Sequence, residues 1–274
     1  MPSPGRDGLR EVDVLRMGTG EYTSSSDHVI AETPIALVYN GASFAVMMAT
    51  PCDLEDFALG FALCEGIVAG PDEFELVDIL RTTRGVSLQG LIPSARFEAL
   101  QQRRRALAGR SGCGLCGVES LEDAVHPAPH VTSDVRVQRA AIVAGMRALA
   151  HGQPLNALTG GAHAAGFVSA GATITVREDV GRHNAVDKLV GALAADAPTR
   201  VSLGTITANG FLAITSRASW EIVHKAAHAG IAIVAAISAP TALAIEAADD
   251  AGITLIAFAR DETMNVYAHA ARVD

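Results

Sequence analysis

The chain has 274 residues, of which 49% are hydrophobic, 19% charged and 4% aromatic, and its formal net charge is −9. These values are typical of a globular protein with a large core, and they argue against sequence-unspecific nucleic-acid binding, which needs a dense cationic surface. The residues up to Ser26 are polar and glycine-rich, and no apolar run approaches the ~18–20 residues of a membrane span. We therefore expect a cytoplasmic protein that binds neither nucleic acid nor membrane.

The first half of the chain is expected to begin with a mobile tail, residues 1–23, followed by a smaller N-terminal α+β subdomain, residues 24–130. Asn40-Gly41 is a hairpin signal between two apolar stretches, because both positions tolerate a positive φ. Asp53 can cap the helix that follows it. The expected elements are strands at 33–39 and 42–48, a helix at 54–64, strands at 75–80 and 85–91, and a polar helix at 95–108.

Two prolines, Pro127 and Pro129, mark the expected domain boundary near residue 130. Beyond it, nearly continuous Val/Ile/Ala strands alternate with helices, which predicts an α/β sheet with parallel members covered on both faces. Ligands of such sheets lie outside the carboxyl ends of the strands. The expected helices are 137–150, 184–193, 219–229 and 241–251, and the expected strands are 164–170, 172–177, 201–206, 211–215, 231–237 and 253–259.

Cys113 and Cys116 form a C-x-x-C pair in a glycine-rich loop, residues 108–120, which we expect to be mobile. With His126 and His130 they would supply four zinc ligands, and the chain would then be a zinc-stabilised binding module that docks a partner without sulfur chemistry. Alternatively, a thiolate on such a loop can accept a persulfide sulfur and pass it on. The spacing alone leaves both alternatives open. The other two cysteines, Cys52 and Cys64, lie in apolar surroundings and are expected to be packing residues.

Several polar turns are expected beside strand ends. In the block 177–188, a helix start offers free N–H groups to an anion, and Arg182, His183 and Lys188 offer charge-assisted donors. The glycine-rich turn 158–165, the arginine- and hydroxyl-bearing turn 215–221 and the polar end of the last strand have similar positions. Each alone is also compatible with an ordinary capped helix or strand end, but together they favour a site for a large phosphorylated ligand.

With these residues in view, the sequence resembles the formate dehydrogenase accessory sulfurtransferase family, FdhD, from about Glu32 to Tyr267. The ten-residue block from Asp179 to Lys188 is the most specific part of the resemblance. One departure is Ser216, where the family pattern Ser-Gly-Arg has a glycine. The motifs that carry the resemblance are Cys113-Gly-Leu-Cys116-Gly, Thr159-Gly-Gly-Ala-His163, Asp179-Val-Gly-Arg-His-Asn-Ala-Val-Asp-Lys188, Ser238-Ala-Pro-Thr241 and Phe258-Ala-Arg260.

The resemblance implies a cytidine-deaminase-like cofactor-binding core over residues 131–274, with a mixed sheet covered by helices, and a homodimer. It implies a sulfurtransferase that takes persulfide sulfur from a cysteine desulfurase and transfers it to the molybdenum bis(molybdopterin guanine dinucleotide) cofactor. This cofactor is the sulfur acceptor and not a permanently bound group, and it then serves formate dehydrogenase. The kinship with deaminases concerns the fold only, because Gly112 replaces the proline of their Pro-Cys-x-x-Cys motif and the chain has no His-x-Glu.

The resemblance also assigns site residues. Cys113 matches the persulfide-carrying cysteine and Cys116 its partner, and no metal ligands are implied. The expected cofactor-binding residues are Gly160, Gly161, His163, Arg182, His183, Arg217, Ser219, Phe258, Ala259, Arg260, Asp261, Glu262 and Thr263.

Overall fold

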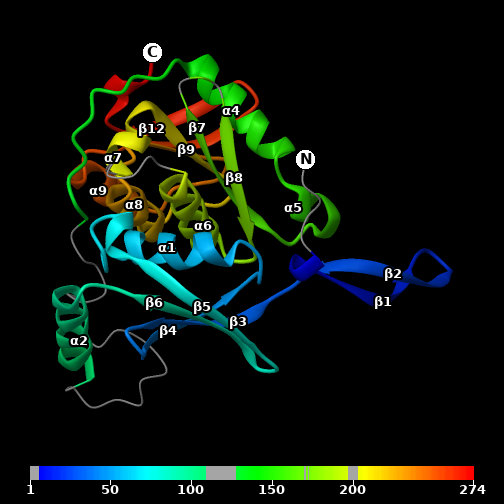
Figure 1. Ribbon diagram of the computed structural model, residues 1–274. Coiled ribbons are helices and arrows are strands. Elements are labelled where there is room, and N and C mark those ends of the chain that lie inside the picture. Colours follow the sequence, from blue (N-terminus) through cyan, green and yellow to red (C-terminus); the bar gives the residue numbers. More distant parts are fainter. Residues whose placement is uncertain (1–5, 109–127, 170, 172, 197–202) are drawn as a thin grey trace.

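The computed structural model describes residues 6–108, 128–169, 171, 173–196 and 203–274 (Figure 1). These residues form a mixed α/β structure with a six-stranded sheet, a four-stranded sheet and a two-stranded sheet. The larger sheet lies in the second half of the chain and the two smaller ones in the first half, with helices packed between and around them. The short 3-10 helices are Arg6–Gly8, Pro71–Glu73, Thr207–Asn209 and Ala270–Arg272.

The six-stranded sheet has the strand order β12-β11-β10-β9-β7-β8. Its three central members β9, β10 and β11 are parallel, whereas β7, β8 and β12 are antiparallel to their neighbours. The parallel strands are almost entirely buried, as expected for apolar strands that helices cover on both faces. The bounds are His163–Ser169 for β7, Ile174–Asp179 for β8, Gly210–Ile214 for β9, Ile233–Ala236 for β10, Thr254–Arg260 for β11 and Thr263–Ala268 for β12.

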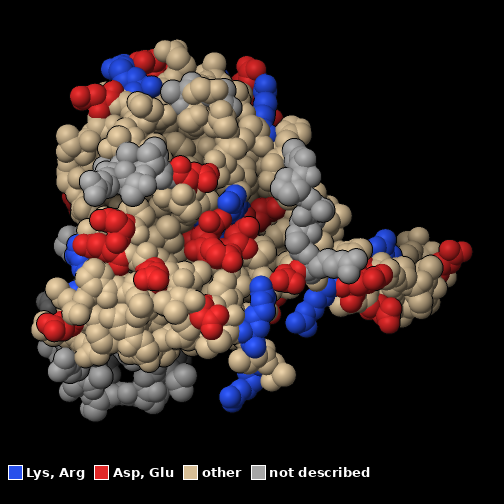
Figure 2. Space-filling view, viewed as in Figure 1, with Lys and Arg blue, Asp and Glu red and all other residues tan. Residues whose placement is uncertain are grey.

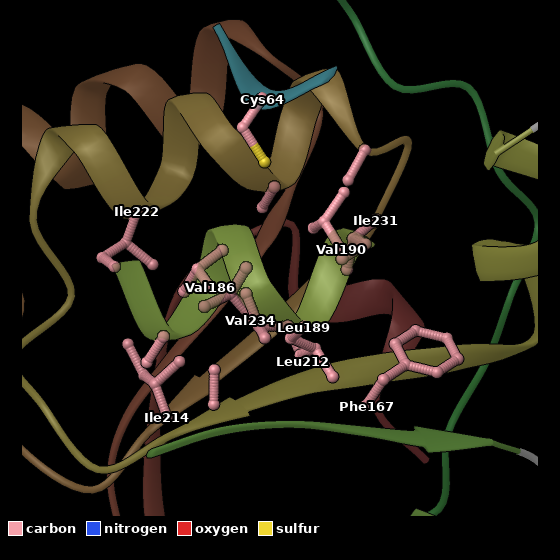
Figure 3. Packing of buried hydrophobic residues seen from close by; sticks show 14 of the residues in the cluster. Cys64, Phe167, Val186, Leu189, Val190, Leu212, Ile214, Ile222, Ile231 and Val234 are labelled. Atoms are coloured by element: carbon pink, nitrogen blue, oxygen red, sulfur yellow. The ribbon is translucent and has the colours of Figure 1, made fainter. Parts of the chain in front are cut away.

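Helices cover both faces of this sheet. Helix α4 (Arg139–His151) lies across one face. The other face carries α6 (Arg182–Ala195), α8 (Trp220–His228) and α9 (Ala242–Asp250), because the crossovers β9-α8-β10 and β10-α9-β11 turn in the same direction. Figure 3 shows the core between them, where Val186 and Leu189 of α6 and Ile222 of α8 face Leu212 and Ile214 of β9. Two short helices, α5 (Pro154–Thr159) and α7 (Leu203–Ile206), lie in the connections.

The four-stranded sheet has the order β4-β3-β6-β5, and its only parallel pair is β3 with β6. The predicted turn between β3 and β4 is confirmed, since Asn40 and Gly41 have φ values of 49° and 80°. Helix α2 (Ser94–Ala108) lies beside this sheet (Figure 1). The strand bounds are Thr33–Tyr39 for β3, Ala42–Ala49 for β4, Glu75–Thr82 for β5 and Gly85–Leu91 for β6.

Helix α1 (Leu54–Cys64) lies between the four-stranded sheet and α6, and so joins the two halves of the described chain. The two helices cross where each has a glycine. A Cβ at Gly60 would lie 1.7 Å from the carbonyl oxygen of Asp187, and a Cβ at Gly191 would lie 1.8 Å from that of Asp56. Only glycine permits this approach, because a backbone carbonyl cannot move aside for a methyl group. The domain boundary near residue 130 stays a prediction.

The structure corrects four expectations. Instead of a tail, residues 9–30 contain an antiparallel hairpin of β1 (Leu9–Met17) and β2 (Tyr22–Ile30), which extends away from the rest of the chain in Figure 1. Backbone pairing holds it, and its strands are mostly exposed, so they lack the apolar alternation that would have predicted them. Residues 203–206, expected in a strand, form α7, and β12 was not predicted. Asp53 has a left-handed backbone and its side chain does not cap α1.

Two further expectations concern cysteines and membranes. Cys64 is completely buried, as predicted, whereas Cys52 is half-buried. Burial raises the pKa of the Cys52 thiol to about 11 and raises the pKa of the Cys64 thiol well above its usual value, so both thiols are protonated at neutral pH. Among the helices of the described residues, none has the length and apolar character that a membrane crossing requires.

Candidate functional site

The predicted polar turns lie at one edge of the six-stranded sheet. The parallel strands β9, β10 and β11 end at this edge, and the antiparallel neighbours place the start of β7 and the end of β8 there too. From β8 to β11 the edge crosses four strand spacings, roughly 19 Å at ~4.8 Å each. We call it the polar edge. In strand order, the turns that form it are 179–183, 160–163, 215–219, 237–241 and 258–263.

Three helices begin at the polar edge, because α6, α8 and α9 follow directly from β8, β9 and β10. The first backbone N–H groups of a helix have no partner within the helix and carry the positive end of its dipole. The edge therefore presents three electropositive helix starts in a row, which is an arrangement suited to phosphate groups.

Arg182 lies at the start of α6, close enough to two predicted site histidines for its charge to act on both. Its charge lowers the pKa values of both His163 and His183, in each case in addition to a larger effect of burial. The pKa of His183 falls to about 4, so this imidazole is neutral at physiological pH. The Nε atom of Arg182 is buried and has no hydrogen-bond partner among the described residues. An arginine with an unused buried donor, next to neutral histidines, is prepared to receive an anion.

His183 connects the starts of α6 and α8. Its Nε2 atom lies 3.4 Å from the Ser219 hydroxyl and 3.7 Å from a carboxylate oxygen of Glu221. Burial by itself would raise the pKa of Glu221, but hydrogen bonds from the Ser219 side chain and from the backbone, together with the nearby Arg182 charge, outweigh it and lower this pKa. Glu221 is thus a carboxylate that holds Ser219 and His183 in place. We did not include it among the predicted site residues, although it follows Ser219 by two positions.

The remaining members of the predicted set in this part of the edge are mostly exposed. Gly160 ends α5 with φ 63°, a conformation that favours glycine, and Gly161 packs against Ile30 of β2. Arg217 is exposed, in the turn between β9 and α8. Ser216, which replaces the glycine of the family pattern, has no positive φ, so the serine fits this turn without strain.

The C-terminal part of the predicted set, residues 258–263, lies at the far end of the polar edge. Phe258 and Asp261 have φ values of 51° and 52°, around a bulge where β11 turns into β12. Arg260 donates from Nε to the carbonyl of Ile237 at 2.7 Å, which ties this turn to the end of β10. These residues share the edge with His183 but not its immediate surroundings, since β10, β9 and β7 separate them from β8.

The other members of the C-terminal set differ in their environment. Ala259 is buried, and the Thr263 hydroxyl donates to the Arg260 carbonyl at 3.2 Å. Glu262 extends toward α4, where its carboxylate lies 3.7 Å from Arg147 and its carbonyl accepts from Arg139. Its carboxylate is therefore engaged on the α4 side of the sheet.

The most specific sequence block, 179–188, is largely buried beneath the edge. Lys188 Nζ lies 2.7 Å from Asp179 Oδ2, and both side chains are fully buried. Lys188 also donates to the Thr50 carbonyl at 2.8 Å, and Asp179 accepts from the Thr50 amide at 2.9 Å. Asn184 donates to Asp179 and to the Met48 carbonyl, at 2.9 Å each. We had expected Lys188 to donate to an external anion. Its buried position excludes this role. It holds the end of β4 against the start of α6.

A second buried charge cluster joins α8 to α1 and α6. Lys225 Nζ lies 2.8 Å from Asp187 and 2.8 Å from Glu65. Burial would lower the pKa of Lys225, but the two carboxylates outweigh it and keep the amine charged. The other carboxylate oxygen of Asp187 and the buried Tyr39 hydroxyl have no hydrogen-bond partner among the described residues. The cluster fixes the three helices below the polar edge.

Of the predicted sulfur-carrying and zinc-binding residues, the structure describes only His130. Cys113, Cys116 and His126 lie outside the described residues. His130 is exposed and its ring lies against Gly252, where an added Cβ would be 2.8 Å from Nε2. Within the described part of the chain, no group of three or more His, Cys, Asp or Glu side chains could hold a metal ion.

The fold and the polar edge define a class of protein. It is a mixed α/β protein in which one sheet edge is suited to bind phosphate groups and in which the described residues contain no metal-binding cluster. Comparison with known proteins identifies the family. The profile of the FdhD/NarQ family matches residues 30–274, and the chain belongs to this family. A sulfur carrier protein FdhD from Xanthomonas campestris pv. campestris (strain B100) is 51% identical over 273 residues, which cover 99% of this chain and 95% of that protein.

Two further comparisons agree. A sulfur carrier protein FdhD from Bordetella petrii is 46% identical over 275 residues, covering 99% of this chain and 96% of its own length. Among solved structures, a formate dehydrogenase accessory protein from Desulfotalea psychrophila superposes with a TM-score of 0.72 at 26% identity, covering 97% of this chain and 99% of that one. The family and the mixed α/β fold predicted from the sequence are thus confirmed.

Proposed function

We propose that this protein is a sulfurtransferase that accepts persulfide sulfur from a cysteine desulfurase on Cys113 and delivers it to the molybdenum bis(molybdopterin guanine dinucleotide) cofactor destined for formate dehydrogenase. The observation that carries this proposal is the polar edge, where Arg182 and three helix starts converge. The names of the relatives, sulfur carrier and formate dehydrogenase accessory protein, supply the reaction class.

The residues of the edge fit the acceptor. The cofactor is large and carries diphosphate groups, which need several separated donors. Arg182 and Arg260 stand near opposite ends of a row roughly 19 Å long, and Arg217 is exposed between them. His163 and His183 are uncharged at neutral pH, so they can donate or accept hydrogen bonds without adding charge. In this proposal the arginines and helix starts hold phosphates, and the neutral histidines orient the ligand.

In this proposal, Cys113 and Cys116 carry out the transfer of the persulfide sulfur. The Cys113 thiolate attacks the terminal sulfur of the donor's persulfide, a new S–S bond forms on Cys113, and the donor cysteine leaves as a thiolate. Cys116 assists as the neighbouring thiol. Described residues end at Ala108 and resume at Ala128. Cys113 follows Ala108 by five positions and Cys116 by eight, so their backbones can lie at most about 18 Å and about 29 Å from Ala108.

The test uses the full chain with a cysteine desulfurase, cysteine and intact-mass spectrometry. We expect the protein to gain increments of about 32 Da, one per added sulfur. Cys113→Ala should abolish the gain, whereas Cys52→Ala should retain it, because the Cys52 thiol is half-buried and protonated. A wild-type protein that gains no mass while the desulfurase is active would overturn the proposal.

Metal analysis separates this proposal from the zinc-binding alternative. One zinc ion bound tightly per chain, and loss of the folded state when it is chelated, would favour the binding module built on Cys113, Cys116, His126 and His130. The proposal predicts that chelation leaves the far-ultraviolet circular dichroism unchanged. The homodimer and the cytoplasmic location stay expectations, and sedimentation equilibrium of the purified chain tests the former.

A further inference from the structure

A cavity with a volume of about 460 Å³ lies beside the polar edge but is separate from it. It is formed where the N-terminal segment, the start of β3 and the turn between β5 and β6 meet. Pro51 lines it, and the preceding residue, Thr50, accepts a hydrogen bond from the Val180 amide at the start of the polar edge. A volume of this size is within the range of small-molecule sites.

Three arginines line this cavity: Arg10 from β1, Arg81 from the end of β5 and Arg84 from the β5–β6 turn. Figure 2 shows basic side chains between the base of the hairpin and this turn. Arg81 pairs with Asp7, at 3.2 Å. The guanidinium groups of Arg10 and Arg84 have no ion-pair or hydrogen-bond partner in the described part of the chain. Two unpaired guanidinium groups therefore come to one cavity from segments that are more than seventy positions apart.

The charge balance of the cavity favours an anion. Its lining has three arginines against two carboxylates, Asp7 and Glu32, on a chain whose net charge is −9. Arg81 compensates Asp7, so one carboxylate faces two free cations. The hydroxyl of Thr83 adds a donor that a phosphate oxygen can accept from, whereas the Thr82 hydroxyl already donates to the Gly85 carbonyl at 3.0 Å. Guanidinium groups match phosphate geometry because each offers two parallel N–H donors.

We infer that this cavity binds a diphosphate group, with Arg10 and Arg84 each holding one phosphoryl unit. The site is distinct from the polar edge and does not depend on the sulfur-carrier proposal, because its residues belong to the four-stranded sheet and the hairpin. The diphosphate can be free pyrophosphate or the diphosphate of a nucleotide, and the two sources share the same contacts with the arginines.

The test is arginine modification of the full chain by phenylglyoxal, mapped by peptide mass spectrometry, with and without inorganic pyrophosphate. Arg10 and Arg84 are exposed, so both should be modified in the free protein and protected when pyrophosphate binds. Arg16 is the matched control, because it lies on the same strand as Arg10 but outside the cavity, beside Asp27 at 3.6 Å. Equal modification of Arg10 and Arg84 with and without millimolar pyrophosphate would overturn the inference.

Calorimetric titration supplies the second measurement. The double variant R10Q/R84Q should weaken pyrophosphate binding about tenfold or more, while R16Q leaves it unchanged. Removal of the opposing carboxylate in E32Q should strengthen it a few-fold. Adenosine diphosphate forms the second arm: tighter binding than pyrophosphate, still lost in R10Q/R84Q, identifies a nucleotide as the source. Binding that R10Q/R84Q leaves intact and R182Q removes would assign the anion to the polar edge and refute this site.

Discussion

Lys188 and Asp179 form an ion pair with 2.7 Å between Nζ and Oδ2, and neither side chain is exposed to solvent. Both residues also contact Thr50, which lies more than 120 positions earlier in the chain. The pair thus connects the end of β4, an edge strand of the four-stranded sheet, to the helix start at the polar edge. The block that is most specific to the family therefore contains buried residues that stabilise the fold.

Loss of this buried cation should be costly. Lys188→Met keeps most of the side-chain volume but leaves the Asp179 carboxylate buried without its partner, so we expect the free energy of unfolding to fall by about 3–5 kcal/mol. Urea denaturation measures this. The control is Arg16→Met, which removes an exposed ion pair with Asp27 and should cost less than about 1 kcal/mol. Similar losses in the two variants would contradict the role given to Lys188.

The crossing of α1 and α6 should not tolerate a methyl group. Gly60→Ala and Gly191→Ala each place a Cβ within 2 Å of a backbone carbonyl oxygen, so we expect a destabilisation of about 3 kcal/mol or failure to fold. Gly204→Ala is the control, since its Cβ would meet no atom within 4 Å and alanine favours a helix. Its melting temperature should equal or exceed that of the wild type. An unchanged melting temperature for Gly60→Ala would show that the helices can separate at little cost.

The histidines of the polar edge should respond to Arg182. Burial and then the Arg182 charge lower the pKa values of His163 and His183, so Arg182→Gln should raise both. Glu221→Gln should lower the pKa of His183 further, because this carboxylate favours the protonated ring. Ring-proton titration by NMR, assigned with His183→Gln, measures each value. A His183 that titrates near 6.5 in the wild type would refute the environment described for it.

The same shift makes stability depend on pH. Between about pH 6.5 and pH 4 the unfolded chain binds a proton at His183 that the folded protein does not. His183 therefore destabilises the fold increasingly as the pH falls through this window, by about 1–2 kcal/mol at pH 5. His183→Gln should reduce the difference in unfolding free energy between pH 7 and pH 5 by that amount. An unchanged difference in His183→Gln would contradict the environment described for His183.

Binding at the polar edge should depend on Arg182. Guanosine 5′-monophosphate carries the end group of the proposed acceptor, and Arg182→Gln should weaken its binding about tenfold through loss of a charge-assisted hydrogen bond. Arg147 lies on α4, on the opposite face of the sheet, and Arg147→Gln is the control expected to bind normally. Equal binding by wild type and Arg182→Gln, measured by calorimetry, would exclude Arg182 as a phosphate ligand.

The local sequence pattern was sufficient to predict most of the secondary-structure elements of the core. The Asn40-Gly41 turn, the amphipathic stretch of α1 and the buried strands β9 to β11 all follow from residue spacing and turn chemistry, because these signals act over a few residues. The polar turns at strand ends were also expected to share one edge, since the carboxyl ends of parallel strands necessarily meet, and they do so in the structure. By itself, therefore, the sequence determined the fold class, the family and the set of turns that form the polar edge.

Tertiary structure decided what each charged residue does. Lys188 is a buried structural cation and Arg182 an edge residue with an unused donor, although they lie six positions apart and were expected to act alike. Local spacing does not encode this difference, because it depends on Thr50 and Met48, which approach only when the two sheets pack through α1. The sequence also did not predict the β1–β2 hairpin, because backbone pairing and not hydrophobic periodicity holds its exposed strands. The arginine-lined cavity at its base was not predicted either, because residues far apart in the sequence form it.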